Sequence, residues 1–174
     1  ACPAGVPEPL PGQFISILLP RPGDAARAPT GDDALLRRPF SVAGHEATAD
    51  GARLRLLYAP VGRVTGRMSA LEEGATLDCL GPLGTAFPPV IPEPAALVAG
   101  GRGVAPLVFL AERLARQGRR FHFLYGARCA GQMLAAERIP GESLWLSTDD
   151  GSLGHAGRVT ALLDRLPVRP AVVL

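Results

Sequence analysis

One glycine-rich run in this sequence has the features of a phosphate-binding loop. It stands between an apolar segment typical of a buried strand (95–99) and a helical pattern (104–117). Glycines let a backbone turn tightly and approach an anion, and a helix start presents free N–H groups and a positive dipole end. The sequence therefore predicts a pyrophosphate site built from Gly100, Gly101, Arg102, Gly103, Val104, Ala105 and Pro106. The glycines do not fit the spacing G-x-G-x-x-G, and a tight strand–helix turn without a ligand is the alternative.

A second set of residues, at the start of an earlier strand-like segment, could hold a phosphate and a planar ring. Arg38 offers a bidentate fork, Phe40 an aromatic face and Ser41 a hydroxyl group. Residues 62–69 lead into a short helix and offer further N–H groups and hydroxyls to an anion. The plain alternatives are a solvated Arg, a core Phe and an N-cap by Thr65.

Two later segments follow predicted strands of an α/β pattern. Residues 125–128 end in Arg128, and residues 147–152 include Asp150. In parallel α/β sheets, ligands lie outside the carboxyl ends of the strands, so a nucleotide would reach both segments. The sequence Asp-Asp-Gly at 149–151 is equally typical of a plain turn.

Hydrolytic and metal chemistry find little support. The sequence has no spacing of acidic residues that suggests a metal site, and Ser41 has no candidate base nearby in the chain. Three histidines and three cysteines are scattered, so neither a CxxC pair nor a disulfide framework is indicated: His45, His122, His155, Cys2, Cys79 and Cys129. We therefore predict no metal ligands and no catalytic side chains, and expect bound nucleotides to supply the reactivity.

The composition excludes several other classes of function. All 18 basic residues are Arg, and the absence of Lys removes Schiff-base chemistry, the phosphate-loop Lys and the protein-kinase Lys. A net charge of +2 without runs of like charge, together with nine aromatic residues, argues against nucleic acid as a partner. The longest apolar stretch, 95–111, carries Arg102 and three glycines, so no membrane span is predicted. Few cysteines and no secretory signal indicate a cytoplasmic protein.

Two different patterns position the candidate groups. Short β-type runs, broken by Gly and Pro and by one helix near 67–73, suggest a small antiparallel barrel or sandwich: 13–19, 39–43, 53–59 and 76–80. After a Pro-rich segment at 90–94, strands alternate with helices, which favours βαβ units and a parallel sheet: strands 95–99, 121–125, 143–147 and 171–174, helices 104–117, 131–138 and 158–166. We predict a two-domain protein, with an antiparallel β-barrel at 1–91 and an α/β nucleotide-binding domain at 95–174. Because the chain begins without Met and stops in an apolar run, we expect a fragment.

Together these motifs resemble the ferredoxin-reductase family, whose members pair an FAD-binding β-barrel with an NAD(P)-binding α/β domain. Residues 38–41 look like its flavin motif, and residues 100–106 are similar to its GGxGxAP nucleotide motif. Within the family, the chain most resembles the electron-transfer subunits of bacterial dihydroorotate dehydrogenases, from about residue 10 to 174. Several runs recur there in the same order: 11–14, 37–42, 81–84, 125–128, 148–152, Gly157 and 159–160.

The resemblance implies which residues contact FAD. Arg38 would pair with the FAD pyrophosphate, Phe40 and Ser41 would lie against the flavin, and residues 57–59 and 64–65 match two further FAD-contacting segments. The implied set is Arg38, Pro39, Phe40, Ser41, Leu57, Tyr58, Ala59, Val64 and Thr65. The family usually has Arg at position 59 and Gly at position 64. If the loop required positive φ at position 64, Val64 would be strained.

The resemblance also implies a function. Electrons would pass from an FMN-bearing catalytic subunit that oxidises dihydroorotate, through a [2Fe–2S] cluster and FAD, to NAD+ in pyrimidine biosynthesis, within a heterotetramer. Family members carry a first strand before Ala1 and a Cys-rich cluster segment after Val173, whose four ligands are not in this chain. A ferredoxin–NAD(P)H reductase, a sulfide-dehydrogenase-type subunit and a non-catalytic flavin-fold module are the alternatives. The choice between NAD and NADP stays open.

Overall fold

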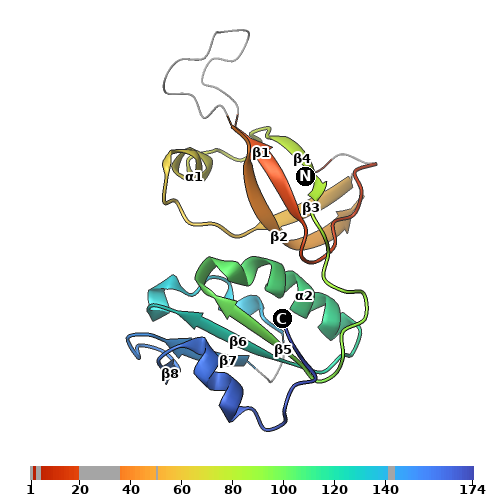
Figure 1. The fold of residues 1–174 in the computed structure, drawn as a ribbon. Helices are drawn as coiled ribbons and strands as arrows, with labels where there is room; N and C mark the ends of the chain where they lie inside the picture. Colours follow the sequence, from red (N-terminus) through yellow and green to blue (C-terminus); the bar gives the residue numbers. More distant parts are fainter. Residues whose placement is uncertain (1, 3–4, 20–35, 50, 141–143) are drawn as a thin grey trace.

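The first half of the chain folds into a four-stranded antiparallel sheet. The computed structural model describes residues 2, 5–19, 36–49, 51–140 and 144–174. The sheet has the order β3-β2-β1-β4 (Figure 1), and its strands are β1 Phe14–Leu18, β2 Arg38–Thr48, β3 Gly51–Leu56 and β4 Asp78–Leu83. Each predicted β-type run of this half overlaps one of these strands. The helix α1, Arg63–Ser69, begins before the predicted start at residue 67.

The second half forms a five-stranded parallel sheet with the order β8-β7-β6-β5-β9. Its strands are β5 Ala95–Gly100, β6 Phe121–Ala127, β7 Leu144–Thr148, β8 His155–Ala156 and β9 Val172–Val173. β5 and β6 lie at the centre and are almost wholly buried, which explains their continuous apolar sequences.

Helical segments connect these parallel strands. The 3-10 turn η1, Gly101–Gly103, leads into α2, Val104–Arg116, where the sequence predicts a helix over 104–117. The helix predicted over 131–138 is instead two 3-10 turns, η2 Ala130–Gln132 and η3 Ala136–Arg138, because Ala135 between them adopts left-handed φ of 54°. The last helix, η4 Val159–Arg165, is also of the 3-10 type.

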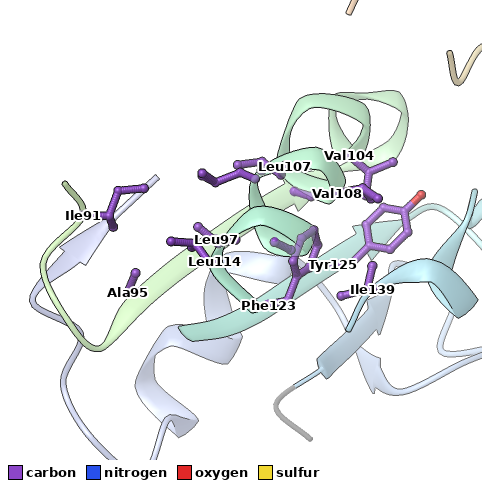
Figure 2. Close-up of a cluster of buried hydrophobic side chains, with 13 residues drawn as sticks. Ile91, Ala95, Leu97, Val104, Leu107, Val108, Leu114, Phe123, Tyr125 and Ile139 are labelled. Carbon is purple, nitrogen blue, oxygen red and sulfur yellow. The ribbon is translucent and has the colours of Figure 1, made fainter. Parts of the chain in front are cut away.

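The core of the α/β part has two layers, one on each face of the parallel sheet. On one face Leu107 and Leu114 of α2 are buried against β5 and β6 (Figure 2), and Leu110 belongs to the same cluster, as the spacing of the three leucines predicts. On the other face Leu162 of η4 packs with Ala96 and Leu124. The sheet is thus covered on both sides, as parallel sheets require.

The helix α2 also contacts the antiparallel sheet, and Figure 1 shows it lying between the two sheets. Phe109 is only 3% exposed and packs with Ile15, Ile17, Phe40 and Val42 of the antiparallel half. The predicted class, an antiparallel sheet followed by a parallel α/β sheet, is confirmed. The domain division around 91–95 stays a prediction.

Ion pairs fix the Pro-rich connection between the halves to the start of β6. Glu93 forms ion pairs with Arg119, at 2.5 Å, and with Arg120, at 3.5 Å. The hydrogen bond from the Arg120 backbone N–H is the largest cause of a lowered pKa at Glu93. The basic pair 119–120 therefore serves the fold. Across the described ranges of the chain, no helix is long and apolar enough to cross a membrane.

Candidate functional site

A large open cleft lies at the carboxyl ends of the parallel strands. Its volume is about 930 Å³, near the upper end of the range of about 300–1,000 Å³ for small-molecule sites. Most of its wall comes from segments that follow β5, β6, β7 and β8, while Ala59 and Val61 come from the antiparallel half. The lining residues are Ala59, Val61, Gly100, Gly101, Arg102, Gly103, Gly126, Ala127, Arg128, Gly131, Gln132, Leu134, Ser147, Asp149, Arg158, Val159 and Thr160.

The predicted phosphate loop forms one wall of this cleft. Positions 100, 101 and 103 face open space, since a Cβ atom at any of them would meet nothing within 4 Å. Gly101 has φ of +50°, a conformation that L side chains rarely adopt. Of the predicted run, Gly100 to Gly103 line the cleft, whereas Val104 and Ala105 are buried in the core and Pro106 lies in the first turn of α2.

Tyr125 holds the loop from below. Its ring is fully buried, and its hydroxyl donates to the Gly101 carbonyl oxygen at 3.2 Å and accepts from the Leu134 N–H at 2.8 Å. Burial raises the pKa of this hydroxyl above its ordinary value. One side chain at the end of β6 thus connects two walls of the cleft. The sequence places Tyr125 in the segment 125–128 at a predicted strand end, but it does not indicate that the hydroxyl contacts the glycine loop.

Three arginines at the cleft carry no carboxylate partner. Arg102 follows β5, Arg128 follows β6 and Arg158 follows β8, and all three are exposed. Within the described residues none of them forms an ion pair, and Asp149 is the one acidic residue of the lining. The cleft therefore presents excess positive charge, as an anionic ligand requires. Arg102 and Arg128 belong to the predicted site, whereas Arg158 does not, because its position at the cleft depends on where β8 joins the sheet.

A buried hydroxyl without a partner lies in the same wall. Ser147 is 0% exposed, and its Oγ has no hydrogen-bond partner among the described residues. Gly126, beside it on β6, leaves little spare room, since a Cβ there would lie 2.7 Å from Cβ of Val159 and 3.0 Å from the Ser147 Oγ. Buried polar groups are normally paired, so this orphaned hydroxyl fits a site that accepts a polar ligand.

Asp150 lies outside the cleft lining. Its carboxylate accepts hydrogen bonds from the Ser152 N–H at 3.0 Å and the Ser152 hydroxyl at 2.6 Å, and these bonds lower its pKa. The neighbouring Thr148 hydroxyl is bonded to the backbone of Leu153. Segment 148–153 is therefore a closed turn, and its chemistry toward a ligand comes from Asp149.

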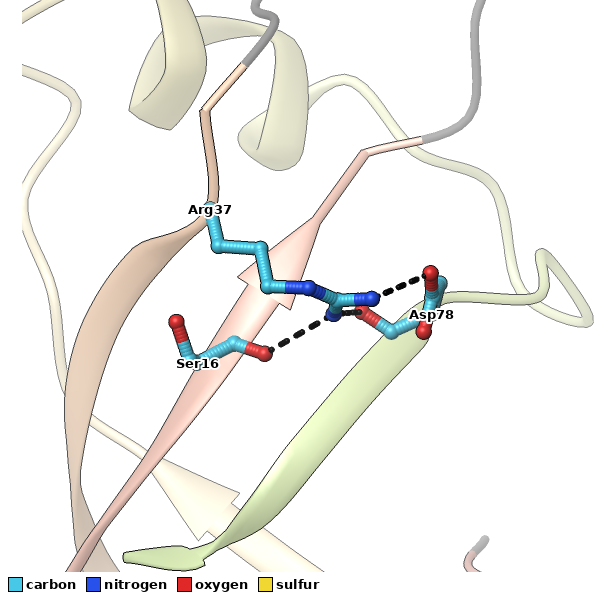
Figure 3. Close-up of polar contacts among 3 residues, drawn as sticks. All are labelled: Ser16, Arg37 and Asp78. Carbon is cyan, nitrogen blue, oxygen red and sulfur yellow. Dashed lines mark hydrogen bonds and ion pairs between the residues drawn. The ribbon is translucent and has the colours of Figure 1, made fainter.

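The two adjacent arginines of the flavin-like motif have different surroundings. Arg37 donates to the Ser16 carbonyl at 3.3 Å and to the Asp78 carboxylate at 2.6 Å, which fastens together β1, the start of β2 and β4 (Figure 3). Arg38 is exposed and, among the described residues, bonds only the carbonyl oxygens of Leu36 and Arg37 through Nη1. Arg37 is thus fixed to the sheet by an ion pair, whereas Nε and Nη2 of Arg38 bond none of the described residues and remain for a ligand.

The remaining flavin candidates lie on the antiparallel half. Phe40 is 9% exposed and meets Tyr58 edge to face, with ring centroids 5.9 Å apart. Pro39 is exposed and Ser41 half-buried on the same strand, while Leu57 packs against the α/β core. Of the nine candidates, Ala59 alone lines the cleft.

The helix α1 takes up the other two flavin candidates. The Thr65 hydroxyl accepts hydrogen bonds from the Val61 and Gly62 N–H groups, each at 3.1 Å, so it caps the helix start. Val64 lies in the helix itself. Among the described residues other than glycine, Ala135 alone has a positive φ, so Val64 is not strained.

No candidate metal cluster occurs in the described part of the chain, where no group of three His, Cys, Asp or Glu residues could hold an ion. The arrangement as a whole can bind an extended anionic molecule against the glycine loop and the three arginines. It also places the antiparallel half, through Ala59 and Val61, at the rim of that site.

Comparison with known proteins gives relatives but no family model that matches the chain. The protein "Dihydroorotate dehydrogenase B (NAD(+)), electron transfer subunit" of Listeria monocytogenes serovar 1/2a is 35% identical over 167 residues, which cover 94% of this chain and 61% of that protein. The protein of the same description from Desulforamulus reducens is 36% identical over 163 residues, 90% of this chain and 56% of that protein. The chain thus spans less than two thirds of the length of these relatives.

A solved structure agrees with these similarities. The NADH-dependent reduced ferredoxin–NADP oxidoreductase superimposes with a TM-score of 0.69 and 30% sequence identity, over 91% of this chain and 53% of that one. The antiparallel sheet followed by a parallel α/β sheet is therefore the ferredoxin-reductase type of FAD/NAD-binding fold.

Proposed function

We propose that this chain, a homologue of the electron-transfer subunits of dihydroorotate dehydrogenase B with a ferredoxin-reductase-type fold, is an FAD-dependent oxidoreductase component. In this proposal the chain passes electrons to NAD+, and it receives them from a partner that oxidises dihydroorotate. The observation that carries the proposal is the cleft, which presents, beside residues of the antiparallel half, a glycine loop and three arginines without an ion-pair partner among the described residues. A dinucleotide bound in the cleft would therefore lie close to an FAD bound by the antiparallel half.

The cleft residues fit a nicotinamide dinucleotide. Gly100, Gly101 and Gly103 leave open space for a pyrophosphate, and α2 begins directly after them, so that the positive end of its dipole favours an anion there. Arg102, Arg128 and Arg158 supply the charge that its phosphates need, and the orphaned Ser147 hydroxyl offers a hydrogen bond. We assign these residues to NAD binding.

The antiparallel half fits FAD less completely. Arg38 has free donors for a pyrophosphate, and Tyr58 offers a half-buried ring near the cleft rim. Phe40 and Thr65 are already engaged, in the core and in the cap of α1. We therefore expect Arg38, Ser41, Tyr58 and Ala59 to make most of the FAD contacts.

The chain itself acts by positioning. Bound FAD and NAD supply the electron and hydride chemistry. The glycine loop and arginines hold the phosphates, the exposed Val61 gives the rim an apolar surface, and Tyr125 keeps the loop in place. No side chain of the cleft needs to act as a general acid or base, because orientation of two reactants accounts for most of such an enzyme's contribution.

The whole protein would extend this arrangement. We propose that it carries a [2Fe–2S] cluster outside the present residues and works with an FMN-bearing catalytic subunit in a heterotetramer, as the resemblance implies. Copurification of the full-length protein with a subunit that oxidises dihydroorotate tests this partner. Isolation of native complexes that lack such a subunit would contradict it.

An absorption spectrum tests the core of the proposal. Purified protein, reconstituted with FAD, should show the visible flavin bands, and these bands should bleach on anaerobic addition of NADH. A colourless preparation that takes up no added FAD would instead support the non-catalytic flavin-fold module.

A second candidate is a ferredoxin–NAD(P)H reductase. It is favoured by the 30% identity with the NADH-dependent reduced ferredoxin–NADP oxidoreductase and by a cleft with three arginines to one aspartate. Under this alternative, reduced ferredoxin replaces the dihydroorotate-oxidising subunit as electron donor. Parallel assays with the two donors distinguish the candidates.

A further inference from the structure

A charged contact joins the two halves of the molecule away from the cleft lining. Nη1 of Arg55, on β3, lies 2.6 Å from Oε1 of Glu112, on α2. The two side chains are 32% and 23% exposed, so water screens this pair less than a surface pair. The strict alternation in 53–56 predicts a half-buried strand, and it gives no sign that Arg55 is covered by a helix.

The Arg55 side chain has a prepared place. Its strand partner on β2 is Gly44, which is buried, and a Cβ at position 44 would lie 2.9 Å from Cζ of Arg55. The guanidinium thus fills the volume that a side chain at position 44 would need. By comparison, Arg53 on the same strand pairs with Glu46 at 3.5 Å, and both are largely exposed, at 71% and 65%.

An apolar anchor stands one helical turn from the charged pair. Phe109 of α2 is 3% exposed and packs into the core of the antiparallel sheet with Ile17 and Val42. Residues three apart on a helix share a face, so Phe109 and Glu112 contact the antiparallel half together. We name Arg55, Phe109 and Glu112 the interdomain brace.

The two elements that the brace connects, β3 and α2, are each joined directly to a segment that lines the cleft. β3 leads directly into segment 57–61, whose Ala59 and Val61 line one wall, and α2 continues from the glycine loop, which lines the other. We propose that the Arg55–Glu112 pair positions these two walls, and hence the flavin and nicotinamide sites of the proposed function, at a fixed separation. The inference rests on the proposed function for its kinetic consequence, but the structural coupling stands on the contact itself.

A double-mutant cycle tests the brace in the full chain. The variants are Arg55→Ala, Glu112→Ala and the double substitution, with Glu46→Ala as the matched control that breaks the exposed pair of the same sheet. Hydrogen exchange of the amides in 57–61 is the first readout, and the rate at which NADH bleaches bound FAD is the second. Flavin reduction is measured at saturating FAD, because segment 57–61 contains Tyr58 and Ala59, which the proposed function assigns to FAD binding.

We expect each single variant to raise hydrogen exchange in 57–61 and to slow flavin reduction by about fivefold to tenfold, the range for a partly desolvated ion pair. The double variant should be no worse than either single variant, because both remove the same interaction. Glu46→Ala should stay within about twofold of the wild type in both readouts.

Two results would overturn the inference: additive effects in the double variant, or variants that unfold more easily while exchange in 57–61 and flavin reduction match Glu46→Ala. The second result would make the pair merely structural. If the wild type binds no FAD, the proposed function fails, yet the exchange data still decide whether the pair couples the two walls.

Discussion

Tyr125→Phe is the sharpest single-atom test of the cleft. The substitution keeps the buried ring in β6 and removes only the hydroxyl that bonds Gly101 and Leu134. Two hydrogen bonds disappear, at 3.2 and 2.8 Å, and the Leu134 amide loses its partner in the described structure. The glycine loop is then no longer fastened to the wall opposite.

The expected cost follows from these two bonds. A net hydrogen bond contributes about 0.5–1.5 kcal/mol, and an unsatisfied buried donor costs about 1–3 kcal/mol. Because the loop side can regain water from the open cleft, we expect the free energy of unfolding to fall by about 2 kcal/mol. Binding of NAD+ should weaken about fivefold to tenfold, equivalent to about 1.0–1.4 kcal/mol, while FAD affinity stays unchanged.

Urea unfolding and calorimetric titration with NAD+ measure these effects. Tyr58→Phe is the matched control for stability, because Tyr58 is the other tyrosine of the chain and its hydroxyl bonds none of the described residues. The raised pKa of Tyr125 adds a pH test. The unfolded state gives up this proton near pH 10 and the folded state only at higher pH, so wild-type stability should decline above about pH 10. The Phe variant should lack that component of the decline.

The reasoning is refuted if both Phe variants unfold at the same urea concentration. It is also refuted if Tyr125→Phe lowers FAD affinity as much as NAD+ affinity, since the hydroxyl would then act through the whole fold and not through the loop.

Four further substitutions separate binding from folding. Arg38→Ala should weaken FAD binding by about 1.5–3 kcal/mol with little loss of stability. Arg37→Ala should instead lower the free energy of unfolding, because the contact with Asp78 is lost. If the wild type and Arg38→Ala bind FAD equally well, Arg38 does not belong to the site. Arg158→Ala should raise the Kd for NAD+ severalfold and flatten its salt dependence, with exposed Arg165→Ala as a control that leaves both unchanged. Gly126→Ala should lower the free energy of unfolding by about 1–3 kcal/mol in chemical denaturation, because the new Cβ would lie 2.7 Å from Cβ of Val159. An unchanged unfolding midpoint would contradict this and show that Val159 moves aside.

Periodicity and glycine placement predict a large part of this fold. The change from β-type runs broken by Gly and Pro to apolar strands separated by helical patterns places the antiparallel half, the parallel half and α2 where the structure has them. The glycine loop also lies where the sequence predicts, since a strand, three glycines and a helix leave few other conformations. These features depend on local sequence, which is why they can be predicted.

Features that depend on distant partners could not be predicted. Nothing local distinguishes Arg37 from Arg38, because the difference is Asp78, some 40 residues later, which claims only the first. The roles of Arg158 and Ser147 depend on which strand ends meet at one edge of the sheet. The helix expected at 131–138 fails because Ala135 is left-handed, and neither its residue type nor its neighbours indicate this.

The position of Phe109 has a consequence for folding. It follows the Pro-rich connection in the chain, yet its ring completes the core that precedes that connection. Cleavage near residue 92 would therefore expose the apolar core face of the antiparallel sheet in one fragment and the Phe109 ring on α2 in the other. We expect the two sheets to unfold in one cooperative transition, and the separated halves to be poorly soluble until they are mixed. The unit that folds cooperatively therefore extends across the Pro-rich linker.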